Sequence, residues 1–212
     1  MIDKLKEEEK ITFPENHELG FLFPNKPCIK DFDSGELDTA KHPVTFVIDN
    51  YGSDNSYGFK LTSHPQPQAL NEFMYVELKK GTDFIDSNKE SSTIKCDHVV
   101  VFGEEEEDKY IMNHFSRRGS IRPERYSEIM THVITRHVLL QENGLATKDP
   151  NTELLLMELN LDKEQVMSSP LYQSLQDKLN GVGLTMAQKK ELEIAKAEQR
   201  ELVQKLEESR KI

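Results

Sequence analysis

The spacing of apolar residues changes about half-way along the chain. Before residue 103 the apolar residues form short runs that are rich in β-branched and aromatic side chains, as strands are. The four clearest runs span 41–49, 57–62, 73–78 and 93–102, with further edge-strand candidates at Phe21 to Phe23 and Cys28-Ile29. Gly, Pro and Asn separate these runs. The pattern predicts a small, mostly antiparallel β-barrel rather than βαβ units.

Helical spacing follows from about residue 120. Pro123 is a favourable first helical residue and Gly144 a natural stop. Between them six residues recur every three or four positions: Tyr126, Ile129, Met130, Val133, His137 and Leu140. Further helices are expected over 152–159, 171–179 and 185–209. The chain is therefore expected to be α+β.

The last expected helix has a narrow apolar seam and a high charge density. The seam consists of Leu192, Ala195, Gln199, Leu202 and Leu206. It is shorter than three heptads, and two alternatives stay open. The helix either contacts a protein partner, including a second copy in a homodimer, or lies on its own domain.

These patterns divide the chain into three parts. Residues 1–103 are expected to form the barrel-like domain, and 104–122 an acidic and then basic linker. Residues 123–212 are expected to form a helical region that ends in the charged, coiled-coil-like helix. In the linker, five consecutive acids at 104–108 precede the arginines.

Composition narrows the function classes. The chain of 212 residues carries 27 Lys and Arg against 38 Asp and Glu, a net charge of −11. This balance argues against a generally basic nucleic-acid binder and against attraction to an anionic membrane surface. No apolar run approaches the roughly 18 residues that span a bilayer. Only Cys28 and Cys96 are present, so we expect a cytoplasmic protein without a disulfide framework.

Motifs for common chemistries are missing from the sequence. The seven His are scattered, with no pair of ligands at helical spacing around a Glu and no nearby Cys pair, so no metal site is predicted. Cys96 lies within an apolar strand pattern and is expected to be a buried, inert thiol. There is no phosphate-binding glycine loop, and no cofactor is expected.

One basic segment stands out against the acidic background. Between His114 and Arg125 the chain contains a Phe and four arginines: Arg117, Arg118, Arg122 and Arg125. Arginine binds phosphate in a bidentate manner and Phe can stack on a base, so these four residues are candidate contacts to single-stranded RNA. Alternatively, they neutralise the acids at 104–108.

Five short blocks follow one another in the first half: Gly35-Glu36, Lys41-His42-Pro43-Val44, Val47-Ile48, Leu61-Thr62-Ser63 and the run from Ser92 to Val99. Their order resembles that of the MazF/PemK family of toxin endoribonucleases. The resemblance covers about residues 11–103. It implies an SH3-like barrel and metal-independent cleavage of RNA, in which the 2′-hydroxyl is the nucleophile.

The resemblance also implies a catalytic set. Thr62 matches the family threonine, whereas the family arginine before proline falls on His42, which is a departure. His42 can exchange a proton near neutral pH, Lys41 can supply positive charge and Thr62 a hydrogen bond. Loss of the arginine removes a bidentate phosphate clamp.

The sequence is therefore compatible with two functions. The first is a MazF/PemK-like RNA-binding or RNA-cleaving protein of a toxin–antitoxin system or another mobile element. The second is a non-catalytic accessory or interaction protein of a plasmid, phage or integrative element, which uses the barrel as a scaffold and the C-terminal helices for protein contacts.

Overall fold

The computed structural model describes residues 20–24, 44–48, 56–62, 69–86, 91–102, 115–148 and 150–209. Its strands are β1 (Gly20–Pro24), β2 (Val44–Ile48), β3 (Ser56–Thr62), β4 (Tyr75–Lys79), β5 (Phe84–Asp86), β6 (Ser91–Lys95), β7 (Val100–Phe102) and β8 (Phe115–Ile121). Its helices are α1 (Asn71–Met74), the 3-10 turn η2 (Pro123–Arg125), α3 (Tyr126–Glu142), α4 (Pro150–Glu158), α5 (Lys163–Ser168), α6 (Pro170–Leu179) and α7 (Met186–Ser209). The α+β class is thus confirmed.

The strands pair in the order β4-β6-β3-β2-β1-β8-β5, and every ladder between them is antiparallel. One side of β3 pairs with β2, and the other with β6 and then β7. The two ends of the path, β4 and β5, meet at a single isolated bridge between Lys80 and Phe84. The expectation of a closed barrel is therefore wrong for the described strands, because no ladder joins β4 to β5.

Several strand predictions need correction. The expected strand 73–78 begins only at Tyr75, because Phe73 and Met74 belong to α1, and the expected strand 93–102 is divided into β6 and β7. The segment at Phe21 to Phe23 forms β1, but it lies between β2 and β8 rather than at an edge. The second half of the predicted linker is strand β8, which pairs with β1 and β5. Polar residues fill the middle of β8, so its sequence has no apolar run, and its extended form comes from pairing on both sides. The predicted strand segment Cys28-Ile29 and the acids at 104–108 lie outside the described residues.

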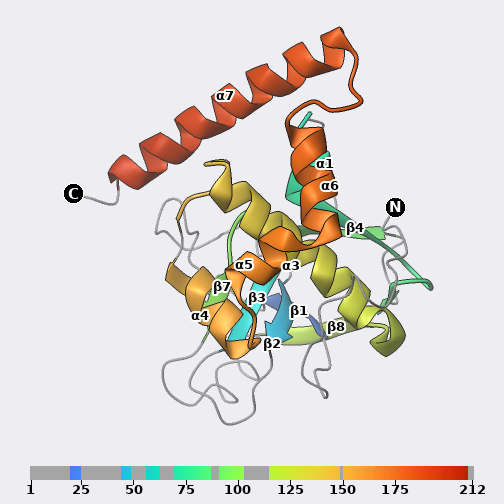
Figure 1. Ribbon diagram of the computed structural model, residues 1–212. Coiled ribbons are helices and arrows are strands. Elements are labelled where there is room, and N and C mark those ends of the chain that lie inside the picture. The colour runs from blue at the N-terminus through green and yellow to red at the C-terminus, as the bar shows by residue number, and fades with distance from the viewer. Residues whose placement is uncertain are drawn as a thin grey trace.

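Helix α3 is the centre of the molecule. It packs against α1 and β4 and also against α5 and α6, as Figure 1 shows. The six apolar-face residues predicted from the sequence are all buried. Ile134, Val138 and Leu139 are buried as well, because other helices cover the opposite side.

One hydrophobic core joins the two halves of the chain. Its largest fully buried side chains include five from strands, five from α3 and the residue before α1: Phe59, Leu61, Leu78, Phe84 and Ile94, then Ile129, Met130, Ile134, Leu139 and Leu140, and Leu70. The segments before and after residue 103 therefore share one core.

Helix α7 lies across one end of the molecule, at the top of Figure 1. Two of its own residues, Leu192 and Val203, are buried. Leu202, which is predicted to lie in the same seam, is 49% exposed. The described part of α7 lies against its own chain through Lys196 and Gln199, and a contact with a protein partner stays a prediction. None of the described helices is both long and apolar enough to cross a membrane.

Candidate RNA site and buried polar network

Of the three predicted catalytic residues, the structure describes Thr62. It is the last residue of β3, is partly exposed, and lies opposite Thr93 of β6. Lys41 and His42 lie outside the described residues. The first described residue after them is Val44, which begins β2 and lies opposite Lys60 of β3.

A single cross-strand row links this end of β3 to β8. Lys60 lies opposite Val44, Val44 opposite Leu22, and Leu22 opposite Arg117. Three strand spacings of about 4.8 Å each therefore separate the backbone of Lys60 from that of Arg117. The row therefore relates a predicted RNA-binding residue to the strand that carries Thr62.

The structure gives Arg125 a different set of contacts from the predicted ones. Its Nε donates to Asp83 Oδ1 at 2.9 Å, and its Nη1 donates to Glu128 Oε2. Asp83 and Glu128 are buried, and the Arg125 side chain is only 18% exposed. Asp83 Oδ2 also accepts from the backbone N–H of Lys79. Arg125 thus fixes the start of α3 to the turn between β4 and β5.

Arg122 is more accessible. Its side chain is 35% exposed, and its Nη1 lies 3.4 Å from Oε1 of the exposed Glu124. The alternative that the acids at 104–108 neutralise the arginines falls outside the described residues. The acids that neutralise Arg125 are Asp83 and Glu128, which lie outside the segment 104–108. Arg117 and Arg118 lie within β8.

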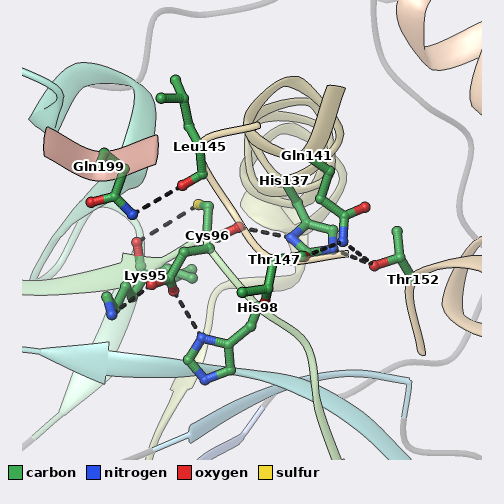
Figure 2. A network of polar contacts seen from close by, with 11 residues as sticks. Lys95, Cys96, His98, His137, Gln141, Leu145, Thr147, Thr152 and Gln199 are labelled. Atoms are coloured by element: carbon green, nitrogen blue, oxygen red, sulfur yellow. Dashed lines mark hydrogen bonds and ion pairs between the residues drawn. The ribbon is translucent and has the colours of Figure 1, made fainter. Parts of the chain in front are cut away.

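A buried polar network that the sequence does not predict surrounds His137 of α3. Its Nδ1 lies 2.8 Å from the carbonyl oxygen of Cys96, and its Nε2 lies 2.8 Å from Thr152 Oγ1. Figure 2 shows the imidazole between these two groups. Gln141 Nε2 donates to Thr152 Oγ1 at 2.9 Å and to the carbonyl of Thr147.

The network fixes the protonation of His137. A carbonyl only accepts hydrogen bonds, so Nδ1 carries the proton and donates to Cys96. Nε2 then accepts from the Thr152 hydroxyl, which in turn accepts from Gln141. Burial lowers the pKa of His137 from 6.5 to about 4, so the ring is neutral at pH 7. A histidine that uses both nitrogens internally holds β6, α3 and α4 together rather than acting on a substrate.

Asp97 forms a second polar cluster beside the first. Its two carboxylate oxygens lie 2.6 Å from Lys95 Nζ and 3.0 Å from His98 Nδ1. Burial acts to raise the pKa of Asp97, but the neighbouring His98 and Lys95 outweigh it and hold that pKa below its usual range. The carboxylate is therefore an ion-pair partner at neutral pH.

Cys96 is buried, as the sequence predicts. Burial raises the pKa of its thiol from 9.0 to about 12, so it is not a nucleophile at neutral pH. Within the described ranges, no group of three or more His, Cys, Asp or Glu is arranged to hold a metal ion.

Few features of the sequence indicate the buried network. His137 was placed on the buried face of its helix, but its partners Cys96 and Thr152 lie 41 and 15 residues away in the chain.

Comparison of the chain with protein-family models, with curated proteins and with solved structures found no match.

Proposed function

We propose that this protein binds single-stranded RNA and cleaves it without a metal ion, as the resemblance to the MazF/PemK toxins implies. The observation that carries the proposal is the register between β2 and β3, in which Val44 lies opposite Lys60. In an antiparallel pair, two steps back on one strand match two steps forward on the other. The register therefore supports a site in which His42 lies opposite Thr62.

The chemistry of this site is a transesterification. The RNA 2′-hydroxyl attacks the adjacent phosphorus, and the bond from phosphorus to the 5′ oxygen breaks. The products are a 2′,3′-cyclic phosphate and a 5′-hydroxyl. His42 takes the proton of the nucleophile in this proposal, while Lys41 and Thr62 stabilise the charge on the phosphorane oxygens. The His42 imidazolium formed in this step, or water, then protonates the 5′ oxygen of the leaving group.

The described contacts of the arginines support a smaller set of RNA contacts within this proposal. Arg117 shares a row with Lys60, and Arg118 follows it in β8. The proposal therefore assigns backbone phosphates to Arg117 and Arg118. Arg122 is peripheral to them, and Arg125 is excluded because its guanidinium is engaged with two buried carboxylates.

The test measures binding and cleavage separately on the full chain. Wild-type protein should bind a mixed-sequence single-stranded RNA at low salt, with an affinity that falls as salt rises by a slope of about 0.7 per phosphate contact. The double variant Arg117→Ala/Arg118→Ala should weaken binding and flatten this slope. Lys189→Ala/Lys190→Ala on exposed positions of α7 removes the same charge and should change neither.

Cleavage is measured for variants of the proposed active-site residues. His42→Ala and Thr62→Ala should abolish cleavage and leave binding nearly intact. Thr82→Ala, in the exposed turn between β4 and β5, should cleave like wild type. Binding that survives with no cleavage by wild type would leave an RNA-binding protein without the catalytic function. An absence of RNA affinity at low salt would contradict the proposal as a whole.

One observation favours the second candidate, a non-catalytic interaction protein. Two large apolar side chains on α7, Ile194 and Leu202, are about half exposed. A helix that buries one stripe and exposes apolar residues elsewhere can contact another protein. This function predicts no RNA affinity at low salt in the assay above, together with a self-association or partner binding that is lost when residues 186–212 are deleted.

A further inference from the structure

Helix α7 is attached to the rest of the molecule by a narrow stripe of side chains. The apolar part of this stripe consists of buried Leu192 and Val203, with half-buried Ala195 and Leu206. The helix has 24 residues, so most of its surface faces away from the body. Burial of so few apolar groups stabilises the docked position only modestly.

The polar part of the stripe binds the ends of two other helices. Lys196 Nζ donates to the carbonyl of Leu179, the last residue of α6, at 3.1 Å. Gln199 Nε2 donates to the carbonyl of Leu145, and Arg200 Nε to that of Asn143, both just beyond the end of α3. Carbonyls at helix C-termini lack partners within the helix and carry the negative end of its dipole. α7 therefore supplies donors to a defined surface, which we term the α7 seat: Asn143, Leu145 and Leu179.

The segment that connects α6 to α7 exposes apolar side chains. α3 and α6 both end in a glycine of positive φ, Gly144 and Gly181, with the hydrogen bonds of a Schellman motif. The residue after that glycine normally packs on the helix, and Leu145 is fully buried in this position. Its counterpart after α6, Val182, is 59% exposed, and nearby Met186 is 81% exposed.

We propose that α7 exchanges between two copies of this chain. In the exchanged dimer the α7 of each copy occupies the α7 seat of the other, with the same contacts that it makes within one chain. The occupant is a second copy because the seat is already complementary to α7. The connection, residues 182–185, contains Gly183 of positive φ and can extend to direct α7 away from its own body. The new contact lies where the two connections meet, and it covers Val182 and Met186.

Cross-linking distinguishes an exchanged dimer from a monomer. Asn143→Cys and Arg200→Cys are introduced together in a Cys28→Ser background and linked with a short bismaleimide at protein concentrations from about 10 µM to 1 mM. Exchange predicts a covalent dimer on a denaturing gel whose fraction rises with concentration. Each single-cysteine variant is the control for random collisions.

Light scattering on the chain without added cysteines tests the connection itself. Wild type should dimerise as concentration rises, and Val182→Ser/Met186→Ser should weaken dimerisation about tenfold or more. Ile194→Ser, which changes an exposed apolar residue elsewhere on α7, should leave dimerisation unchanged. Deletion of residues 186–212 should give a monomer.

Three results would overturn the exchange. They are a chain that stays monomeric over the whole concentration range, a dimer whose cross-links are all within one chain, and a dimer that survives deletion of α7. A dimer that responds to Ile194→Ser but not to Val182→Ser/Met186→Ser would likewise place the contact elsewhere. None of these outcomes depends on RNA binding.

Discussion

The Nε2 atom of His137 and the Oγ1 atom of Thr152 lie 2.8 Å apart in the buried space between α3 and α4. The Nδ1 proton is committed to the carbonyl of Cys96, so the hydroxyl must donate to Nε2. The same hydroxyl accepts from Gln141. One threonine therefore satisfies two side chains of α3.

Replacing Thr152 by Val should lower the free energy of unfolding by about 1–3 kcal/mol. The substitution keeps the shape of the side chain but leaves His137 Nε2 and a Gln141 N–H without this buried partner. Thr82→Val, in an exposed turn, is the matched control and should change stability by less than about 0.5 kcal/mol. Equal effects of the two substitutions in denaturant titrations would show that the network contributes nothing measurable.

Stability should fall with acid in a window set by His137. Its pKa is about 4 in the folded protein and is expected near 6.5 when unfolded, so unfolding takes up a proton between these values. The contribution of His137 is complete above about pH 6.5 and is lost as pH falls towards 4. Asp97, whose pKa is held below 3.8, adds its loss only in stronger acid.

His137→Gln should therefore flatten the decline between pH 6.5 and 4 while leaving the decline in stronger acid. The measurement is the free energy of unfolding in denaturant at a series of pH values. A variant that is less stable at pH 7 but has the same pH slope as wild type in that window would contradict the assignment.

Arg125 should contribute more to stability than Arg122. Arg125→Ala leaves Asp83 and Glu128 as buried carboxylates without this cation, and we expect a loss of about 3 kcal/mol. Arg122→Ala removes a partner of the exposed Glu124 and should cost less than about 1 kcal/mol. Thermal and denaturant unfolding of the two variants measures this difference. If Arg122 were the costlier residue, the role assigned to Arg125 would be wrong.

Replacing the glycine that ends α6 by Ala should lower the stability more than the same replacement at the end of α3. Gly144→Ala and Gly181→Ala each place a side chain at positive φ and should cost about 1 kcal/mol. At Gly181 the new Cβ also comes within 3.1 Å of Lys189 Cγ, whereas at Gly144 nothing lies within 4 Å. Gly181→Ala should therefore be the costlier, and Lys189→Ala in the same chain should reduce its cost to that of Gly144→Ala. An unchanged cost in the double variant would exclude the contact with Lys189.

Regular patterns of apolar residues predicted much of the fold. β2, β3 and α3 follow from their apolar residues, and the end of α3 from Gly144. β8 was missed because its strand form depends on β1 and β5. Its central residues, Ser116 to Ser120, carry no alternating apolar pattern.

The polar contacts of the site could not be predicted, because they join residues that are far apart in the sequence. The interpretation of Arg125 as an RNA contact rested on its neighbours in the sequence, whereas its partner Asp83 is 42 residues away. The prediction that Leu202 lies in the buried seam was wrong for a related reason. The sequence shows the helical spacing of apolar residues but not which face of the helix packs against the rest of the molecule. The pairing of His42 with Thr62 stays a prediction, supported by the register of Val44 and Lys60.

The identity of the RNA ends is the most direct test of the proposed cleavage. Wild-type protein is incubated with single-stranded RNA in EDTA, and the fragments are examined by mass spectrometry. The transesterification predicts 2′,3′-cyclic phosphate and 5′-hydroxyl ends, which should be missing with Thr62→Ala and with a DNA oligonucleotide of the same sequence. RNA that stays intact with wild type, or fragments that carry 5′-phosphates, would contradict the account.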